Sequence, residues 1–195
     1  MNKRLYGLMR VLLRPFYAVF FPVQLDGLEN IPREGGFILC ANHCSNHDPF
    51  FLAAHIEDRY LHYMAKSSLF RWKITANFFS ALGAFPVDRG NSDLAAIRTA
   101  MKILKEGHGL AIFPQGTRVK DNHPAPMLEG VSMIAMRANA PVIPAYIGGP
   151  FRLFRKTQLS FGPPVSFEGL PRRVDSDTLD KATRRIEAAV WGLKR

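Results

Sequence analysis

The sequence has few cysteines and nothing that divides it into parts. Only Cys40 and Cys44 occur in 195 residues, and they lie four positions apart. Such a pair provides no disulfide framework of the kind that secreted domains use, so reduced thiols are expected. Internal repeats, low-complexity tracts and convincing linkers are also lacking. A chain of this length is therefore expected to form one domain with a substantial core.

A long apolar run is lacking as well, which decides how the N-terminal segment is interpreted. Arg14 and Pro15 interrupt its apolar stretch and no small-residue cleavage pattern follows, so a secretory signal is not indicated. The stretch falls far short of the roughly 20 apolar residues that span a bilayer. Apolar residues instead recur at steps of three and four, with basic residues toward the other side: Leu5, Leu8, Met9, Leu12, Leu13, Phe16 and Phe20 against Lys3, Arg10 and Arg14. Residues 1–24 are predicted to form an amphipathic helical segment, which either rests on a membrane or packs on the domain 25–195.

Negative charge is scarce, and none precedes Asp26. Lys and Arg number 26 against 16 Asp and Glu, which gives a formal net charge of +10. This balance favours anionic partners, such as an acidic lipid surface, a phosphorylated metabolite, an acidic carrier protein or a nucleic acid. Because no aromatic-interleaved basic motif is present, nucleic acid is the least favoured of these.

The remaining sequence alternates between short apolar runs and longer helical patterns. Strands are predicted at 37–42, 61–66, 84–88, 110–114 and 142–147, with a further hairpin or edge strand within 158–169. Helices are predicted at 49–58, 67–81, 91–106, 129–138 and 175–193. This alternation predicts a single α/β domain, with a mainly parallel mixed sheet flanked by helices and preceded by the N-terminal amphipathic helix.

Three of the most polar stretches follow predicted strands. They are "NHCSNHD" after 37–42, "DRGNSD" after 84–88 and "QGTR" after 110–114. Functional residues of α/β sheets gather at the carboxyl ends of strands, so the three stretches are expected to form one site.

The first of these stretches admits several interpretations. Pro49 suits the first turn of a helix, which makes Asp48 the predicted N-cap and residues 43–47 a strand-to-helix turn. Such a turn could gather Cys40, His43, Cys44 and His47 around zinc, although no second cluster of ligands occurs elsewhere. Ser45 or Cys44 could act as a nucleophile, but no "GxSxG" elbow is present. Asp48 could instead orient His43 as a general base, or the stretch could be only a polar turn.

Four blocks in order carry a family resemblance. "NHCSNHD" (42–48) has the form N-H-x4-D, and "GAFPVDRG" (83–90), "IFPQGTR" (112–118) and "APVIPAYI" (140–147) follow it. Together they resemble the motifs of the glycerolipid acyltransferases, the family that includes lysophosphatidic acid acyltransferases. The resemblance covers nearly the whole chain after the N-terminal helix, and that helix is itself similar to the membrane-associating region of bacterial members.

The resemblance implies direct acyl transfer from a thioester, acyl-coenzyme A or acyl-carrier protein, to a glycerophosphate hydroxyl. Lysophosphatidic acid is the expected acceptor and phosphatidic acid the product. His43 would deprotonate the hydroxyl, and Asp48 would orient His43 and stabilise its imidazolium. The only co-substrate implied is the thioester, with no metal or other cofactor. The implied location is the cytoplasmic face of the cell membrane, where the enzyme would be peripheral or monotopic.

The resemblance also suggests residues that bind the acceptor. Arg89 and Arg118 can supply forked hydrogen bonds to its phosphate, and Lys66 is similar to a family position near that phosphate. Lys66 could equally be a solvated lysine after its strand, and either arginine could form only a surface ion pair, for instance Arg89 with Asp88 or Asp93.

The third block departs from the family pattern in one residue. Gln115 stands where the family usually has glutamate, followed by Gly116 and Thr117 as in the family. Gln115 keeps one carbonyl acceptor but loses the charge and gains a donor, which could signal a different acceptor. Gly116 would allow the substrate to approach the backbone closely.

Alternatives from other classes remain open at this point. They are a related acyltransferase with another lysophospholipid or glycerol-3-phosphate as acceptor, a zinc-dependent hydrolase built on the Cys/His cluster, and a non-catalytic binder of anionic lipid or nucleic acid.

Overall fold

A computed structural model describes residues 1–88, 93–119, 123–171 and 173–195. The helices are α1 (Lys3–Phe20), α2 (Asp48–His55), α3 (Lys73–Ala81), α4 (Leu94–Lys105), α5 (Gly130–Ala138) and α6 (Ser176–Trp191), with the 3-10 helices η1 (Leu28–Asn30) and η2 (Ser67–Phe70). The strands are β1 (Val23–Asp26), β2 (Phe37–Ala41), β3 (Leu61–Lys66), β4 (Ala84–Val87), β5 (Gly109–Ile112), β6 (Val142–Ile147) and β7 (Thr157–Phe161).

All these strands belong to one sheet in the order β1-β7-β6-β2-β5-β3-β4. Every neighbouring pair is parallel except β6 and β7, which are antiparallel. The predicted α/β domain with a mainly parallel mixed sheet is therefore confirmed. Parallel pairing brings the carboxyl ends of β2, β5, β3 and β4 to one edge of the sheet, which positions the loops discussed below.

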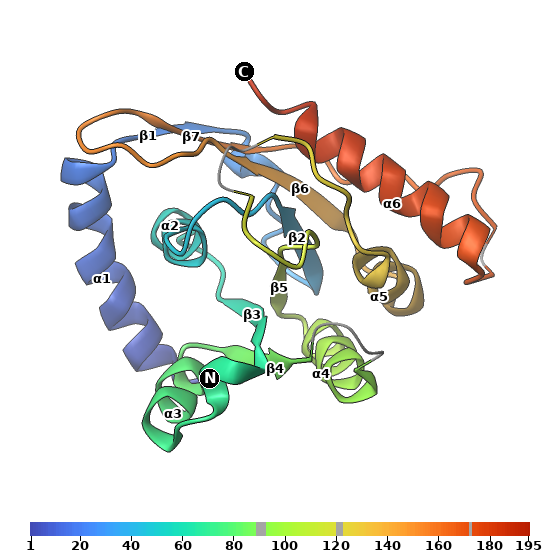
Figure 1. Cartoon of the computed structure of the whole chain (residues 1–195), viewed down its shortest axis with the longest axis horizontal. Helices are drawn as coiled ribbons and strands as arrows, with labels where there is room; N and C mark the ends of the chain where they lie inside the picture. The colour runs from blue at the N-terminus through green and yellow to red at the C-terminus, as the bar shows by residue number, and fades with distance from the viewer. Residues whose placement is uncertain (89–92, 120–122, 172) are drawn as a thin grey trace.

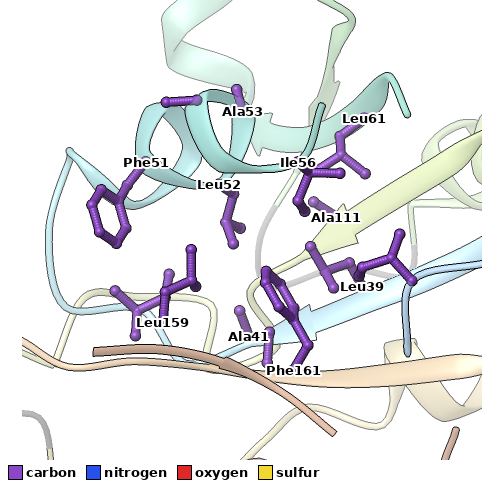
Figure 2. Close-up of a cluster of buried hydrophobic side chains, with 14 of the residues drawn as sticks. Leu39, Ala41, Phe51, Leu52, Ala53, Ile56, Leu61, Ala111, Leu159 and Phe161 are labelled. Atoms are coloured by element: carbon purple, nitrogen blue, oxygen red, sulfur yellow. The ribbon is translucent and has the colours of Figure 1, made fainter. Parts of the chain in front are cut away.

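Helices cover both faces of the sheet (Figure 1). Successive strand side chains point to opposite faces, so Leu39 and Ala41 of β2 pack with α1 and α2, whereas Ile38 and Cys40 pack with α4, α5 and α6. Figure 2 shows the first cluster, in which Phe51 and Leu52 of α2 lie over the sheet. The burial of all five residues of β2 explains why that strand is apolar throughout.

The N-terminal helix is amphipathic, as predicted, and one of its faces packs on the domain. Tyr6 and Tyr17 are buried, and the Arg10 guanidinium donates hydrogen bonds to the carbonyl oxygens of Ala53, Glu57 and Arg59. These three acceptors lie in and after the last turn of α2, where carbonyl groups lack helical partners. The outer face of α1 stays exposed and apolar: Leu8, Val11, Leu12, Phe16 and Val19. In the part of the chain that the structure describes, no helix combines the length and apolar character needed to cross a bilayer.

Three details differ from the predicted elements. The strand β1, which begins inside the segment 1–24, was not predicted, because only a four-residue run with exposed central positions forms it. The helix predicted at 67–81 is divided into η2 and α3. The prediction of an edge position for the strand within 158–169, which was based on Pro163 and Pro164, was wrong. The strand β7 lies between β1 and β6, and both prolines follow its last residue.

Candidate active site

The turn after β2 is anchored to the neighbouring strand by the buried Asn42. Its side-chain amide donates to the carbonyl oxygen of Ile147 at 2.8 Å, and its side-chain oxygen accepts from the Ile147 amide at 2.7 Å. Ile147 ends β6, which pairs with β2. This paired hydrogen bond fixes the start of the turn relative to the sheet, so the residues that follow leave the sheet edge in one direction.

His43 and Asp48 form a hydrogen-bonded pair within that turn. The distance from His43 Nδ1 to Asp48 Oδ2 is 2.7 Å, and the same oxygen accepts from the amides of Cys44 and Ser45 at 2.7 and 2.8 Å. The Asp48 side chain is fully buried, whereas that of His43 is 12% exposed. Because a carboxylate accepts hydrogen bonds, the Nδ1 atom of His43 is the donor of this bond. The pair therefore holds the imidazole in one orientation, with Nε2 as the second ring nitrogen.

The prediction that Asp48 is the N-cap of the following helix was wrong. His47 occupies that position without a side-chain capping bond, and Asp48 is the first residue of α2, followed by Pro49. The Asp48 carboxylate turns back to the amides of the preceding residues instead of capping those of the helix. Its negative charge still lies at the positive end of the α2 dipole, which stabilises it.

The loop after β5 contacts His43 from the other side. The Phe113 ring stacks on the imidazole, with ring centroids 4.4 Å apart and an angle of 25° between the planes. The Gln115 side-chain oxygen accepts from the His43 amide at 2.7 Å, and the Val119 amide donates to the His43 carbonyl at 2.8 Å. Since β2 and β5 are adjacent strands, the first and third sequence blocks meet as predicted.

A cavity of about 1060 Å³ opens beside His43. Most of its lining is apolar and comes from both faces of the sheet. From α1, α2, β3, α3 with the residue after it, and β4 come Met9, Leu13, Phe50, Ala65, Phe79, Leu82 and Val87, and from α4, α5 and the loop before it come Ile97, Leu128, Val131 and Ile134. Polar groups in the lining include Lys66 and Arg118. The His43 imidazole, charged side chains and a large apolar wall thus border one space.

Comparison with known proteins agrees with this geometry. Residues 22–148 match the family model named Acyltransferase. A 1-acyl-sn-glycerol-3-phosphate acyltransferase of Bacillus subtilis (strain 168) is 36% identical over 77% of this chain and 79% of its own length. One from Streptococcus pneumoniae (strain ATCC BAA-255 / R6) is 27% identical over 94% of this chain and 69% of its own.

A solved structure extends the likeness to the fold. The crystal structure of the 1-acyl-sn-glycerophosphate acyltransferase from Thermotoga maritima superimposes with a TM-score of 0.75 at 26% identity, covering 98% of this chain and 79% of that one. The chain belongs to the acyltransferase family. It is an O-acyltransferase, and the resemblance drawn from the four sequence blocks is confirmed.

Only some of the residues predicted to bind substrate line the cavity of this acyltransferase. Gly116 and Arg118 line the cavity, and Arg118 Nη1 donates to the Asn46 side-chain oxygen at 2.7 Å. Gly116 has a φ of 68°, in the left-handed region that favours glycine. Thr117 is exposed and Gln115 is buried, and neither is among the lining residues. Lys66 lines the cavity at the end of β3.

The second polar stretch reaches the cavity only in part. Arg89 lies outside the described residues, so neither its predicted phosphate contact nor its ion pair can be placed. Asp88 and Asp93, on either side of it, line the cavity, and the Asp88 amide donates to Asp93 Oδ2 at 2.9 Å. The hydrogen bonds from the amides of Asp88 and Ala96 lower the pKa of Asp93.

The zinc and nucleophile interpretations of the turn find no geometric support. Cys40 packs with α4, α5 and α6, whereas Cys44 packs on the opposite face of the sheet with α1 and α2. Among residues 1–88, 93–119, 123–171 and 173–195, no group of three or more potential ligands converges on a point. Burial raises the pKa of both thiols, and Asp48 adds to this effect at Cys44, so neither is a ready thiolate.

Several contacting residues were not predicted from the sequence. Tyr17 of α1 lies 3.3 Å from His47 Nδ1, and its hydroxyl also donates to the His47 carbonyl. Burial, and then the Asp48 carboxylate, raises the pKa of Tyr17, which therefore stays a neutral donor. Phe113 stacks on His43, and Asn46 accepts from Arg118. Phe113 and Asn46 stand inside the family blocks, but nothing in their spacing indicates which side chain they meet.

Proposed function

We propose that this acyltransferase moves a fatty acyl group from an acyl thioester to the hydroxyl of lysophosphatidic acid, or of a related glycerophosphate, to give phosphatidic acid. The observation that carries the proposal is the His43–Asp48 pair beside a widely apolar cavity whose wall includes Lys66 and Arg118. The relatives from Bacillus subtilis and Streptococcus pneumoniae are named for this acceptor.

Proton transfer by His43 is the central step of the proposed mechanism. Nε2 takes the proton of the acceptor hydroxyl as its oxygen attacks the thioester carbonyl. The tetrahedral intermediate then collapses, the carbon–sulfur bond breaks, and the thiolate recovers the proton from the imidazolium. Asp48 stabilises the imidazolium throughout, because its carboxylate is 2.7 Å from Nδ1. The proton taken from the acceptor thus leaves with the thiol, and the enzyme returns to its starting state.

Recognition of the acceptor phosphate is assigned to Arg118 and Lys66. Both line the cavity that contains His43, and Arg118 is oriented by its hydrogen bond to Asn46. Charge-assisted hydrogen bonds from these cations suit a phosphate with negative charge. Arg89 remains a candidate ligand of the same group from the sequence resemblance. The apolar lining suits the acyl chains, whose burial contributes about 0.8 kcal/mol per methylene group.

The choice of donor is a separate part of the proposal. The formal charge of +10 suits both the phosphates of coenzyme A and an acidic acyl-carrier protein. Both donors present the same thioester to His43, so the mechanism is the same for either.

A membrane location is proposed from an exposed apolar surface, which we call the α1 surface. It consists of three parts. They are the outer face of α1, the segments η2 and α3 beside the first turn of α1, and residues 152–156 beside its last turn. The Asn2 amide donates to the Ala81 carbonyl, and the Phe154 amide donates to the Phe20 carbonyl, so the three parts are continuous. Trp72 and Ile74 are 72% and 85% exposed.

Basic side chains accompany these apolar ones. Arg71 and Lys73 flank Trp72, and Arg152, Arg155 and Lys156 surround Phe154 in the sequence; all five are exposed. Exposed apolar groups beside cations suit the interface of an anionic membrane. We propose that this acyltransferase works at the cytoplasmic face of the cell membrane as a peripheral or monotopic enzyme, where its lipid acceptor is located.

Sedimentation with vesicles tests this location. We expect the wild type to bind vesicles of phosphatidylglycerol and phosphatidylcholine, and the double variant Trp72→Ser/Ile74→Ser to bind them at least several-fold more weakly. Leu94→Ser is the control, because Leu94 is 57% exposed but belongs to α4, on the other face of the sheet. Equal binding by all three proteins would contradict the assignment of the α1 surface.

A grid of donors and acceptors tests the reaction. Purified enzyme is incubated with acyl-coenzyme A or acyl-carrier protein and with lysophosphatidic acid, glycerol-3-phosphate or another lysophospholipid. We expect phosphatidic acid from lysophosphatidic acid, and its loss with His43→Ala. The control is His108→Ala at the opposite end of the sheet, which should retain turnover. Failure with every glycerophosphate acceptor would contradict the proposed function.

A further inference from the structure

Gln115 contacts the backbone of His43, and its own side chain is almost completely buried. Only 8% of the residue is exposed. Its side-chain oxygen accepts the hydrogen bond from the His43 amide at 2.7 Å. A backbone N–H can only donate, so the atom that faces it must be the carbonyl oxygen of Gln115. This leaves Nε2 on the other side, buried and without a hydrogen-bond partner among the described residues.

The side chain of Gln115 is directed away from the substrate cavity. Its neighbours Pro114 and Gly116 line the cavity, whereas Gln115 does not. The residues before and after Gln115 therefore border the cavity, whereas the Gln115 side chain extends to His43 in the turn after β2. A residue that contacts the acceptor would be expected in the lining.

The other contacts of the same loop complete a cradle for His43. Phe113 stacks on the imidazole, and the Val119 amide donates to the His43 carbonyl. The amide of His43 is thus held by Gln115, its carbonyl by Val119 and its ring by Phe113 and Asp48. Gln115 thus fixes the backbone amide of the residue that carries the imidazole.

We propose that Gln115 is a positioning residue for His43 and not a ligand of the acceptor. This inference rests on the proposed function, because it assigns a role within the same proton transfer. The role requires a side chain of this length that ends in an oxygen able to accept a hydrogen bond. Whether that oxygen belongs to an amide or to a carboxylate does not matter. Glutamine and glutamate both meet that requirement, which explains how glutamine can occupy this position in an acyltransferase.

Two substitutions separate the positioning role from acceptor binding. Gln115→Met keeps the length of the side chain but removes the oxygen, so the His43 amide loses its partner. We expect kcat to fall by on the order of 10- to 100-fold, because small displacements of a catalytic group have effects of that size. The KM for lysophosphatidic acid should stay within about twofold, since no contact to the acceptor is removed. Gln115→Glu keeps the oxygen and should retain kcat within a few-fold at neutral and alkaline pH.

The pH profile of Gln115→Glu provides a further measurement. The charged groups that bond to His43 or line the cavity beside it are Asp48 of α2, Arg10 of α1, Lys66 of β3, Arg118 of the loop after β5, and Asp88, Asp93 and Glu129. A second carboxylate beside His43 favours the imidazolium form. The acid limb of kcat/KM should therefore move to higher pH than in the wild type.

A spectroscopic readout does not depend on turnover. In the wild type, the proton between His43 Nδ1 and Asp48 should give a resolved downfield NMR signal without substrate. We expect this signal to shift or broaden in Gln115→Met, to persist in Gln115→Glu, and to be unchanged in the control Gln24→Met, which alters an exposed residue of β1. If Gln115→Met fails to fold, Gln115→Asn serves instead, because its shorter side chain cannot reach the His43 amide.

The outcomes distinguish the inference from the proposed function. Raised KM with retained kcat in Gln115→Met would overturn the inference and make Gln115 an acceptor ligand. Wild-type kinetics and an unchanged Nδ1 signal would overturn it as well. An inactive wild type whose Nδ1 signal still depends on Gln115 would overturn the proposed function and leave the positioning role in place.

Discussion

His43 and His62 lie at opposite ends of the parallel sheet and meet opposite surroundings. At the carboxyl end, His43 follows β2, bonds to the buried Asp48 and borders the cavity. At the amino end, His62 is the second residue of β3, and its ring faces that of His108 at 5.5 Å between centroids. One imidazole has a carboxylate that stabilises its charged form. The other faces a second imidazole.

The electrostatic consequence is clearest at the amino end. Burial, followed by His108 and the N-terminal ammonium group, lowers the pKa of His62 to about 4, against smaller opposing effects of the Gly83 backbone and Glu106. A residue kept neutral in this way cannot store a proton during a reaction at neutral pH. An imidazole thus becomes a candidate base through its carboxylate partner and its access to a cavity.

The largest effect is expected when the carboxylate of Asp48, at the carboxyl ends of the strands, is replaced by an amide. Asp48→Asn should lower kcat by about 1000-fold, because the imidazolium is no longer stabilised. The fold should survive, since His43, Cys44 and Ser45 all donate to the single atom Oδ2, and an amide oxygen can take its place. Steady-state kinetics measure the loss, and circular dichroism with urea unfolding checks the fold. Near-normal kcat would mean that Asp48 only holds the turn.

A smaller effect is expected from the removal of the Arg118 guanidinium from the cavity wall. Arg118→Ala should raise the KM for lysophosphatidic acid by roughly 10-fold or more, as expected for the loss of a charge-assisted hydrogen bond to phosphate. The change in kcat should be minor, because Arg118 does not contact the reacting atoms in the proposed mechanism. Arg137→Ala removes an exposed charge from the last turn of α5 and should leave KM unchanged. A fall in kcat at constant KM would argue against the phosphate role.

The comparison also explains what the sequence could predict at the site. The spacing of His43 and Asp48 and the proline after them indicate a strand-to-helix turn, and a short turn leaves few ways for the two side chains to meet. The contacts from Gln115 and Phe113 depend on the register between β2 and β5, which lie about 70 residues apart in sequence. Such long-range register is not visible in local patterns. The cap position of Asp48 was mistaken because its carboxylate accepts from the amides of Cys44 and Ser45, which precede it, instead of from the first amides of the helix.

The fold was predictable where burial produces strong patterns. The strand β2 is buried at every residue, and β6 is also buried throughout, so both appear as apolar runs. The strand β1 has exposed central residues and carries no such pattern. The position of β7 was mistaken because Pro163 and Pro164 were counted with the strand, although it ends at Phe161.

The smallest effect is expected at the amino end, in the pH dependence of stability. The folded pKa of His62 is about 4, below its ordinary value of 6.5, so between these values the unfolded chain binds a proton that the folded chain does not. Stability should therefore fall as the pH falls from about 7 to 4, by about 1–2 kcal/mol after discounting for partial exposure.

His62→Gln should reduce the difference between urea midpoints at pH 7.5 and pH 5. Burial also lowers the pKa of His55, so part of the acid loss should remain. His123→Gln, at an exposed residue, is the control. Equal pH dependence in wild type and His62→Gln would show that the amino-end imidazole does not resist protonation, and the contrast between the two ends would then rest on Asp48 alone.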